Sequence, residues 1–569
     1  MKKLLAVLLA LAMVFSLAAC QSGGTTEPAK ETTPKADDST TKADEPTTPA
    51  ETDAPLPWYM WDTAHPERYG GTIRAQYGDW SPSWDPMGQA SWTTYFWAMP
   101  VFQSCLIKGD DGQVYPQICT YEMSEDGLTI KITIRDGVKF SDGEPVEAED
   151  IIASLTRAGE LVASVKTSLW DILDHYDIDG NTITFHMTQY KSGTLRGVFG
   201  DARNSNCAVM KKEICEKYGT DLIYDLNDCI GTGPYKFVVD ECETEMKAVY
   251  ERNEYYLPNL DNPDDNGIAS PNYQYAEKLE YLKLGKDTMF MAMVNDELDA
   301  CSSTDKESFD TLLAPTGEFK MEQYNSTGTY YAFFNCKEGR AMADPNLRKA
   351  IAAAFDYMEC AVAMYGDFAR KHDSILVDGV FRDYYERDNY RNQDWFDAND
   401  LTIAKKYLDA SSYNGEELKL VGFQDSFMPA LKYLDELGIK YTWTKLDNAT
   451  LRGYAEDEAN ADKWDMIYRP NPLASTPDGW NYTFYQVWSW GEPRAQELMD
   501  QLKAVPYGTE ESYKIWDELN ALVCEQCPWI IIMTQTHCMM TRNDLHLRRN
   551  IDEYWYHLGY WDNPDQHVR

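Results

Sequence analysis

The chain has 569 residues, with 93 acidic and 52 basic side chains and a formal net charge of −41 at pH 7. This charge excludes nucleic acid as a partner, because binding to phosphate depends on cationic contacts. The length exceeds what one hydrophobic core usually supports, so two or more lobes are expected.

The first residues predict export from the cytoplasm. Lys2 and Lys3 precede an apolar stretch over residues 4–17, which is shorter than the ~20 residues of a membrane-spanning helix. A basic start, a short apolar segment and small residues before a cleavage site are the parts of an export signal. We therefore expect residues 1–19 to be a signal peptide.

The signal ends in Leu-Ala-Ala-Cys at Cys20, which resembles the lipobox of bacterial lipoproteins. This resemblance implies that Cys20 carries a diacylglyceryl group, and two acyl chains suffice for stable anchoring. The protein would then sit on the extracytoplasmic face of the cell membrane. A plain secretory signal is the alternative.

Residues 20–57 are rich in Thr, Pro and Ala and contain no aromatic residue. Such a segment buries too little apolar surface to offset its loss of conformational entropy. We expect a disordered tether between the anchor and the folded part.

Strand and helix patterns follow the tether. Apolar and polar residues alternate over 128–134 and 183–187, each after a Gly-containing turn, which predicts two strands. Helical spacing of apolar residues predicts a helix over 148–155 between them. A further strand pair is expected at 233–238 and 248–250.

The clearest helix start is Asp344-Pro345, because aspartate caps the free amides and proline suits the first turn. The elements expected after it are 404–408, 418–421, 428–437, 440–443, a helical region over 495–523 and a buried strand over 529–533. This alternation predicts an α/β, or mixed α+β, fold.

Cys524 and Cys527, with His537 and Cys538 nearby, invite comparison with a redox or zinc site. The pair ends an amphipathic helix and precedes an apolar strand, which favours buried, unpaired cysteines. The eight histidines are scattered along the chain, which disfavours a nickel binder. No metal site and no cofactor are predicted.

Three groups of motifs resemble one protein family. They are Asp136–Gly143 with Ala148–Ile151, Gly231–Tyr235 with Glu251–Tyr256, and Phe334-Asn335 with Leu347–Ile351 and Ala354–Asp356. The family is the peptide/nickel class, family 5, of extracytoplasmic solute-binding proteins, of the oligopeptide-binding type that serves ABC importers. Most of these residues are expected to be scaffold, with Arg348 a partly exposed salt-bridging residue.

The resemblance implies a two-lobed fold like that of periplasmic binding proteins, with a hinge and a subdomain inserted in the first lobe. Lobe I is placed at 58–104, 229–324 and 530–569, the inserted subdomain at 105–228, and lobe II at 325–529. The hinge is expected at Ser326, Thr327 and Gly328, where small residues absorb a dihedral change.

In oligopeptide-binding members an aspartate of lobe II accepts the ligand's α-ammonium group. Here Ser475 and Thr476 stand where that aspartate and its neighbour would fall, while Asp478 matches another aspartate of the family. Amino-terminal capture is therefore not carried over to this chain. Arg469 could bind a ligand carboxylate bidentately, or pair with a neighbouring acid.

Aromatic side chains supply flat apolar surface for a ligand. The candidates in lobe II are Trp480, Tyr482, Trp488 and Trp490. Those that would meet them from lobe I on closure are Trp80 and Trp84.

These features predict a lipid-anchored, monomeric substrate-binding protein that captures oligopeptides between its lobes and delivers them to an ABC permease. An oligosaccharide-binding member of the same family is the alternative, favoured by the 17 tryptophans and the missing aspartate anchor. A secreted hydrolase is less favoured, because no nucleophile elbow, zinc-binding His-Glu-x-x-His helix or phosphate loop occurs. We therefore expect no enzymatic activity.

Overall fold

The computed structural model describes residues 57–87, 92–200, 207–263, 267–378, 381–474, 476–477, 479, 489–549 and 554–568. Residues Leu56–Arg569 belong to one structural unit. None of the described helices combines the length and the apolar character needed to cross a membrane.

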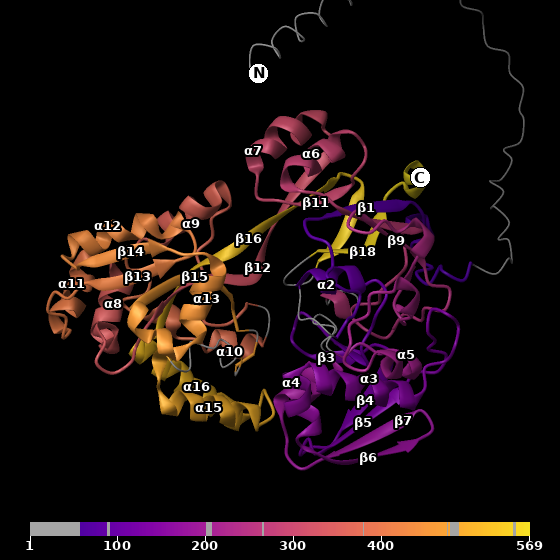
Figure 1. Ribbon diagram of the computed structural model, residues 1–569, viewed down its shortest axis with the longest axis horizontal. Coiled ribbons are helices and arrows are strands. Elements are labelled where there is room, and N and C mark those ends of the chain that lie inside the picture. Colours follow the sequence, from indigo (N-terminus) through magenta and orange to yellow (C-terminus); the bar gives the residue numbers. More distant parts are fainter. Residues whose placement is uncertain are drawn as a thin grey trace, which may run out of the picture. The chain divides into compact units, whose positions relative to one another are not determined.

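A ten-stranded mixed sheet runs through this unit, with strand order β14-β13-β15-β12-β16-β11-β1-β10-β9-β8 (Figure 1). Two long strands, β12 (Phe319–Phe334) and β16 (Trp529–Arg542), pair antiparallel within it. The strands on the β16 side are β11 (Ala300–Ser302), β1 (Thr72–Tyr77), β10 (Lys278–Lys283), β9 (Lys247–Arg252) and β8 (Tyr235–Phe237). Those on the β12 side are β15 (Met466–Pro472), β13 (Leu418–Gly422) and β14 (Tyr441–Lys445). The combination of this sheet with flanking helices confirms the expected fold class.

Helices flank the β12 side of the sheet (Figure 1). They are α8 (Pro345–Ala354), α9 (Tyr357–Tyr365), α10 (Arg382–Glu386), α11 (Leu401–Ala410), α12 (Met428–Glu436), α13 (Asn448–Glu456), α15 (Pro493–Lys503) and α16 (Glu510–Gln526). The other side of the sheet carries α2 (Trp92–Ala98), α6 (Lys286–Val294), α7 (Lys306–Ser308) and the hairpin of β17 (Leu545–Arg549) and β18 (Tyr554–Trp561).

Residues 105–228 contain a separate four-stranded antiparallel sheet with order β4-β5-β7-β6. Its strands are β4 (Cys119–Met123), β5 (Thr129–Ile134), β6 (Leu173–Asp179) and β7 (Thr182–Met187), beside a small hairpin of β2 (Leu106–Lys108) and β3 (Val114–Pro116). The helices here are α3 (Ala148–Leu161), α4 (Ala163–Val165) and α5 (Lys212–Tyr218). The strands predicted at 128–134 and 183–187 and the helix predicted from residue 148 are confirmed.

Each half of the large sheet has its own hydrophobic core. One core draws on buried residues between Tyr330 and Met533, and the other on residues from Ile73 to Tyr324 and from Met539 to Trp561. The lobe boundaries given above stay a prediction, and the names lobe I, inserted subdomain and lobe II are used below for those residue ranges.

Local sequence explains where helix α8 begins. The Asp344 side chain accepts a hydrogen bond of 2.8 Å from the Asn346 amide, and Pro345 occupies the first turn. This confirms the predicted helix start. The apolar stripe that includes Leu347 and Ile351 is fully buried against the core of lobe II.

The helical character predicted over 495–523 is confirmed, and the structure divides it into two helices. Helix α15 ends at Lys503, and Pro506 and Gly508 lie in the connection. Thr509 then caps α16 and accepts a hydrogen bond of 3.2 Å from the Ser512 amide. Proline, glycine and a new cap together end one helix and start another.

The expectation that Arg348 is partly exposed is wrong, since only 1% of the residue is exposed. Its Nε donates to the carbonyls of Gln526 and Cys527 at 2.9 and 3.0 Å, and its Nη1 donates to that of Ala343 at 3.0 Å. The guanidinium therefore satisfies the free carbonyls at the end of α16, where a positive charge also suits the helix dipole.

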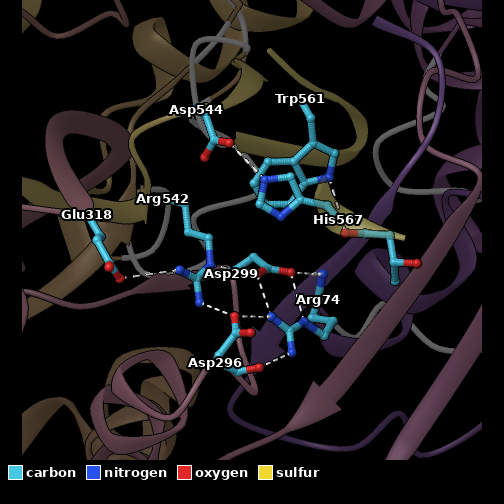
Figure 2. A network of polar contacts seen from close by, with 9 residues as sticks. Arg74, Asp296, Asp299, Glu318, Arg542, Asp544, Trp561 and His567 are labelled. Atoms are coloured by element: carbon cyan, nitrogen blue, oxygen red, sulfur yellow. Dashed lines mark hydrogen bonds and ion pairs between the residues drawn. The ribbon is translucent and has the colours of Figure 1, made fainter. Parts of the chain in front are cut away.

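An ionic network centred on the buried Asp299 joins three distant parts of lobe I (Figure 2). Arg74 of β1 donates from Nε and Nη2 to the two carboxylate oxygens of Asp299, at 2.9 and 2.7 Å. Arg542, at the end of β16, donates from Nε to the same carboxylate at 3.0 Å. Asp296 accepts from both arginines, and Glu318 lies 3.8 Å from Arg542. Asp299 thereby connects β1 to the end of β16.

We expect Asp299→Ala to lower the free energy of unfolding by about 3–5 kcal/mol, because it leaves buried guanidinium groups without their carboxylate. Chemical denaturation of the purified protein measures the loss. Asp409→Ala, which removes the exposed partner of Lys405 at 3.2 Å, is the control and should change little. Equal losses in the two variants would contradict a structural role for the network.

Candidate functional site

A cavity of about 300 Å³ lies over the neighbouring strands β1, β11, β16 and β12. It is lined by Gln76, Tyr77, Gly78, Asp79, Phe96, Lys286, Ser302, Tyr324, His537, Met539, Tyr554 and Tyr556. Residues 76–79 and Ser302 mark the carboxyl ends of the parallel strands β1 and β11. Ligands of open α/β sheets bind at such strand ends. All of the lining residues fall in the range of lobe I.

Aromatic rings form two walls of this cavity. In one wall, the centre of the Tyr77 ring lies 5.4 Å from both the Phe96 and the Tyr556 ring centres. In the other, the Tyr324 ring lies 5.4 Å from His537 and 5.0 Å from Tyr554. Tyr554 and Tyr556 share one face of β18 because strand side chains alternate. The walls offer flat apolar surface on two sides.

Burial shifts the pKa of two polar side chains in the second wall, His537 and Tyr554. Burial lowers the pKa of the His537 imidazole below its usual value, so the ring is neutral at pH 7. The Tyr554 hydroxyl donates a 2.7 Å hydrogen bond to Glu322, and burial and this carboxylate together raise the Tyr554 pKa. Both side chains therefore present neutral hydrogen-bonding groups beside the rings.

Two charged side chains of opposite sign lie at the rim, where both residues are exposed. They are Asp79, just after β1, and Lys286, in the first turn of α6. Within the described ranges neither charge has an ion-pair partner. The rim can therefore pair with a ligand that carries both an ammonium and a carboxylate group.

The two predicted residues of lobe I are not part of the lining of this cavity. Trp80 is half-buried and its ring lies 4.7 Å from Trp97. Trp84 is only 7% exposed and packs edge-on against Phe237 at 5.1 Å. Trp84 belongs to the core of lobe I, and contact of either tryptophan with a ligand stays a prediction.

The predicted residues of lobe II are described only in part. Arg469 is half-buried on β15, where it pairs with Tyr331 of β12, and its Nε donates to the Pro470 carbonyl at 3.3 Å. Trp490 is buried, donates from Nε1 to Gln526 Oε1 at 2.7 Å and meets the Trp529 ring edge-on at 5.6 Å. The remaining predicted positions, Cys20, Asp478, Trp480, Tyr482 and Trp488, lie outside the described residues.

The predicted hinge falls on an irregularity in the β12–β16 ladder. The register shifts between the pairs Asn325–Thr536 and Thr329–Thr534. A side chain added at Gly328 would lie 1.9 Å from the Gln535 amide oxygen, so glycine permits this close approach. The side chains of Ser326 and Thr327 lie outside the described part, and hinge motion itself stays a prediction.

The inserted subdomain contacts lobe II directly. The Arg196 guanidinium carbon lies 4.1 Å from the ring centre of Phe381 and 4.6 Å from that of Tyr507. The Tyr507 hydroxyl also lies 3.4 Å from Ser192 Oγ. Cation–π contacts of this kind stabilise the arrangement in which the two parts meet.

The Cys524–Cys527 pair lies at the end of α16, where both residues are buried. Burial raises the pKa of each thiol to about 12, which keeps both protonated at neutral pH. Metal ligation requires the thiolate. The expectation that this pair holds no metal stays a prediction.

The aromatic and charged lining of the cavity was not predicted from the sequence. The alternation of Tyr554 with Tyr556, and of His537 with Met539, is a signal that residues share one strand face. The sequence does not say that those two faces meet. They meet because β16 lies in the same sheet as β1, with β11 between them, and β18 packs on β1.

Comparisons with known proteins identify the family and the fold of the chain. A family model described as "Bacterial extracellular solute-binding proteins, family 5 Middle" matches residues 113–492, more than half of the chain. The glutathione-binding protein GsiB of Salmonella typhi is 31% identical over 475 residues, covering 78% of this chain and 83% of that protein. The probable peptide ABC transporter periplasmic-binding protein y4tO of Sinorhizobium fredii is 22% identical over 347 residues, 60% of this chain. That match spans 63% of the y4tO length, which is less than two thirds.

Solved structures share the fold at low sequence identity. The ABC transporter substrate-binding protein CtaP from Listeria monocytogenes has a TM-score of 0.69 at 17% identity, covering 87% of this chain and 100% of that chain. The oligopeptide-binding protein AppA from Bacillus subtilis, in complex with a nonapeptide, has a TM-score of 0.61 at 15% identity, covering 87% and 99%. The chain therefore belongs to family 5 of the bacterial extracellular solute-binding proteins, which confirms the family predicted from its motifs.

Proposed function

We propose that this chain is the substrate-binding protein of an ABC importer, that it acts as a monomer, and that its ligand is an oligopeptide. The observation that carries the proposal is the family match over residues 113–492. Relatives with peptide-binding names and the nonapeptide complex of a protein with the same fold support a peptide ligand.

The chemistry of the cavity supports a peptide as well. Aromatic walls suit apolar side chains, and the neutral His537 offers a hydrogen bond to a peptide group. Asp79 and Lys286 at the rim match the ammonium and carboxylate groups that a peptide carries. Lys286 is notable because the chain as a whole is strongly acidic.

An oligosaccharide is the second candidate. Stacked rings such as Tyr77 on Phe96, with their planes 28° apart, are surfaces on which sugar rings also pack. A sugar would need neither of the charges at the rim. The two candidates therefore differ in their dependence on Lys286.

We expect a peptide mixture, and not an oligosaccharide mixture, to raise the melting temperature of the protein lacking residues 1–20. A ligand that binds only the native state stabilises it by about 2.7 kcal/mol at one hundred times its Kd. For a peptide identified in this way, Lys286→Met should weaken binding about 10- to 100-fold, because a charge-assisted hydrogen bond is lost. Calorimetric titration measures the change.

Lys306→Met is the matched control, since Lys306 of α7 lies outside the cavity lining and pairs with Asp310, which follows α7. This variant should bind the peptide as the parent does. Stabilisation by oligosaccharides alone would favour the second candidate. Equal affinity of Lys286→Met and the parent would remove Lys286 from the site.

Ligand capture in this proposal depends on closure of lobe II onto lobe I and the inserted subdomain. In this proposal the contacts of Arg196 with Phe381 and Tyr507 belong to the closed arrangement. Apparent affinity falls when the binding-competent state is less populated. A residue remote from the cavity can therefore change affinity.

Arg196→Ala should weaken ligand binding about 2- to 30-fold, which corresponds to losing a cation–π contact worth about 0.5–2 kcal/mol. Small-angle scattering with saturating ligand should show a more open average shape than the parent. Arg387→Ala is the control, because that guanidinium lies 4.3 Å from the Tyr513 ring within lobe II. Parent-like affinity in Arg196→Ala would refute its role in closure.

The proposal includes a lipid anchor at Cys20. Cys20→Ala should move the protein from the membrane fraction to the soluble fraction of cells, since a diacylglyceryl group needs the thiol. Cell fractionation followed by immunoblotting measures the distribution. Retention of the variant in the membrane fraction would argue against lipidation.

A further inference from the structure

Two histidines of the inserted subdomain lie side by side in its four-stranded sheet. His175 of the edge strand β6 pairs directly with His186 of β7. Their rings are stacked, with centres 4.4 Å apart and planes 14° apart. Directly opposed residues of an antiparallel pair bring their side chains this close.

Asp177 completes a cluster with these histidines. It lies two residues after His175 and therefore on the same face of β6. Its Oδ2 is 3.7 Å from His175 Nε2 and 3.5 Å from His186 Nε2. Ligand atoms around a tetrahedral ion with bonds near 2.0–2.1 Å are separated by about 3.4 Å. The Asp177 oxygen stands close to that spacing from both imidazole nitrogens, and one ligand atom from each of the three residues lies within 4.8 Å of the other two.

Asp174 supplies a second, independent feature of a metal site. The register of β6 against β7 shifts between Leu173 and His175, so Asp174 stands as an extra residue in the ladder. Its Oδ2 lies 2.7 Å from His175 Nδ1. A carboxylate on Nδ1 holds the proton there and leaves Nε2 as the ligating atom, as in carboxylate–histidine–metal sites.

The surroundings leave room and charge for an ion. The side chains of His175 and Asp177 are 55% and 72% exposed, so water can fill further coordination positions. Asp174 and Asp177 together balance the charge of a divalent cation. Lys131 of β5 lies on the same face of the sheet as this cluster. Its ammonium group is 3.7 Å from Glu122 of β4, so its charge is paired with a carboxylate outside the cluster.

We propose that His175, Asp177 and His186 form a binding site for a divalent transition-metal ion such as Zn²⁺ or Ni²⁺, with Asp174 as the positioning residue for His175. Imidazole ligands favour such ions over Mg²⁺ and Ca²⁺, which prefer all-oxygen sites. The ion joins the edge strand β6 to β7 and therefore stabilises the inserted subdomain. This site lies outside the ligand cavity and departs from the absence of a metal site expected from sequence.

Competition of the purified protein with a chromogenic chelator for Zn²⁺ tests the site. We expect one equivalent to bind and to raise the melting temperature, since an ion that binds the native state stabilises it. His186→Gln and Asp177→Asn should each weaken binding about 100-fold, and Asp174→Asn about 10-fold. A large excess of Mg²⁺ should not displace the ion.

His65→Gln is the matched control, because His65 forms a comparable exposed pair with Glu67 at 3.2 Å, and the described part of the chain groups no third ligand with them. It should bind Zn²⁺ as the parent does. The Co²⁺ spectrum should lack the sulfur-to-metal charge-transfer band that cysteine ligands produce. Absence of stoichiometric binding, parent-like affinity in His186→Gln and Asp177→Asn, or an equal loss in His65→Gln would each overturn the proposal.

Discussion

The pairing of β12 with β16 is the constraint on which the rest of the structure depends. These strands run through both halves of the ten-stranded sheet and pair from Phe319–Arg542 at one end to Phe333–Trp529 at the other. The Asp299 network holds the lobe I end of β16 against β1 (Figure 2). The cavity wall carried by Tyr324 and His537 exists only while this pairing holds. Backbone hydrogen bonds between two long strands thus position both the connection between lobes and the candidate site.

The cationic side chains of this acidic chain differ in how deeply they are buried. Arginines such as Arg74 and Arg348 are nearly inaccessible and neutralise a carboxylate or a set of helix carbonyls. Their cost of desolvation is offset only by full hydrogen bonding, which both achieve. Lys286 differs because it is exposed and lines the cavity in lobe I. The surroundings of a cation, rather than its residue type, therefore separate the buried arginines from the exposed Lys286.

Local patterns predicted local structure well. Asp344 and Pro345 carry their own physical reason for starting a helix, and the alternation over 128–134 is enough to make a strand. Differences from the predictions arise where a local signal competes with another or with tertiary packing. Pro506, Gly508 and Thr509 divide into two helices a region for which the sequence predicts only helical character. The sequence around Arg348 predicts a surface residue. The side chain is buried because it donates to carbonyls at the end of helix α16, which is distant in sequence.

The sequence by itself determined the family, the mixed α/β fold class and most of the elements, because motif order and periodicity are properties of neighbouring residues. Only the tertiary structure decided which distant residues meet. Asp299 joins Arg74 and Arg542 because strand order places β1, β11 and β16 side by side. Tyr77 joins Tyr556 because β18, which belongs to a separate hairpin, packs on β1. His175 and His186 become neighbours through one turn and one shift of register. Contacts within a sheet depend on the register in which its strands pair. A hydrophobic pattern is compatible with several registers, and the folded sheet adopts one of them.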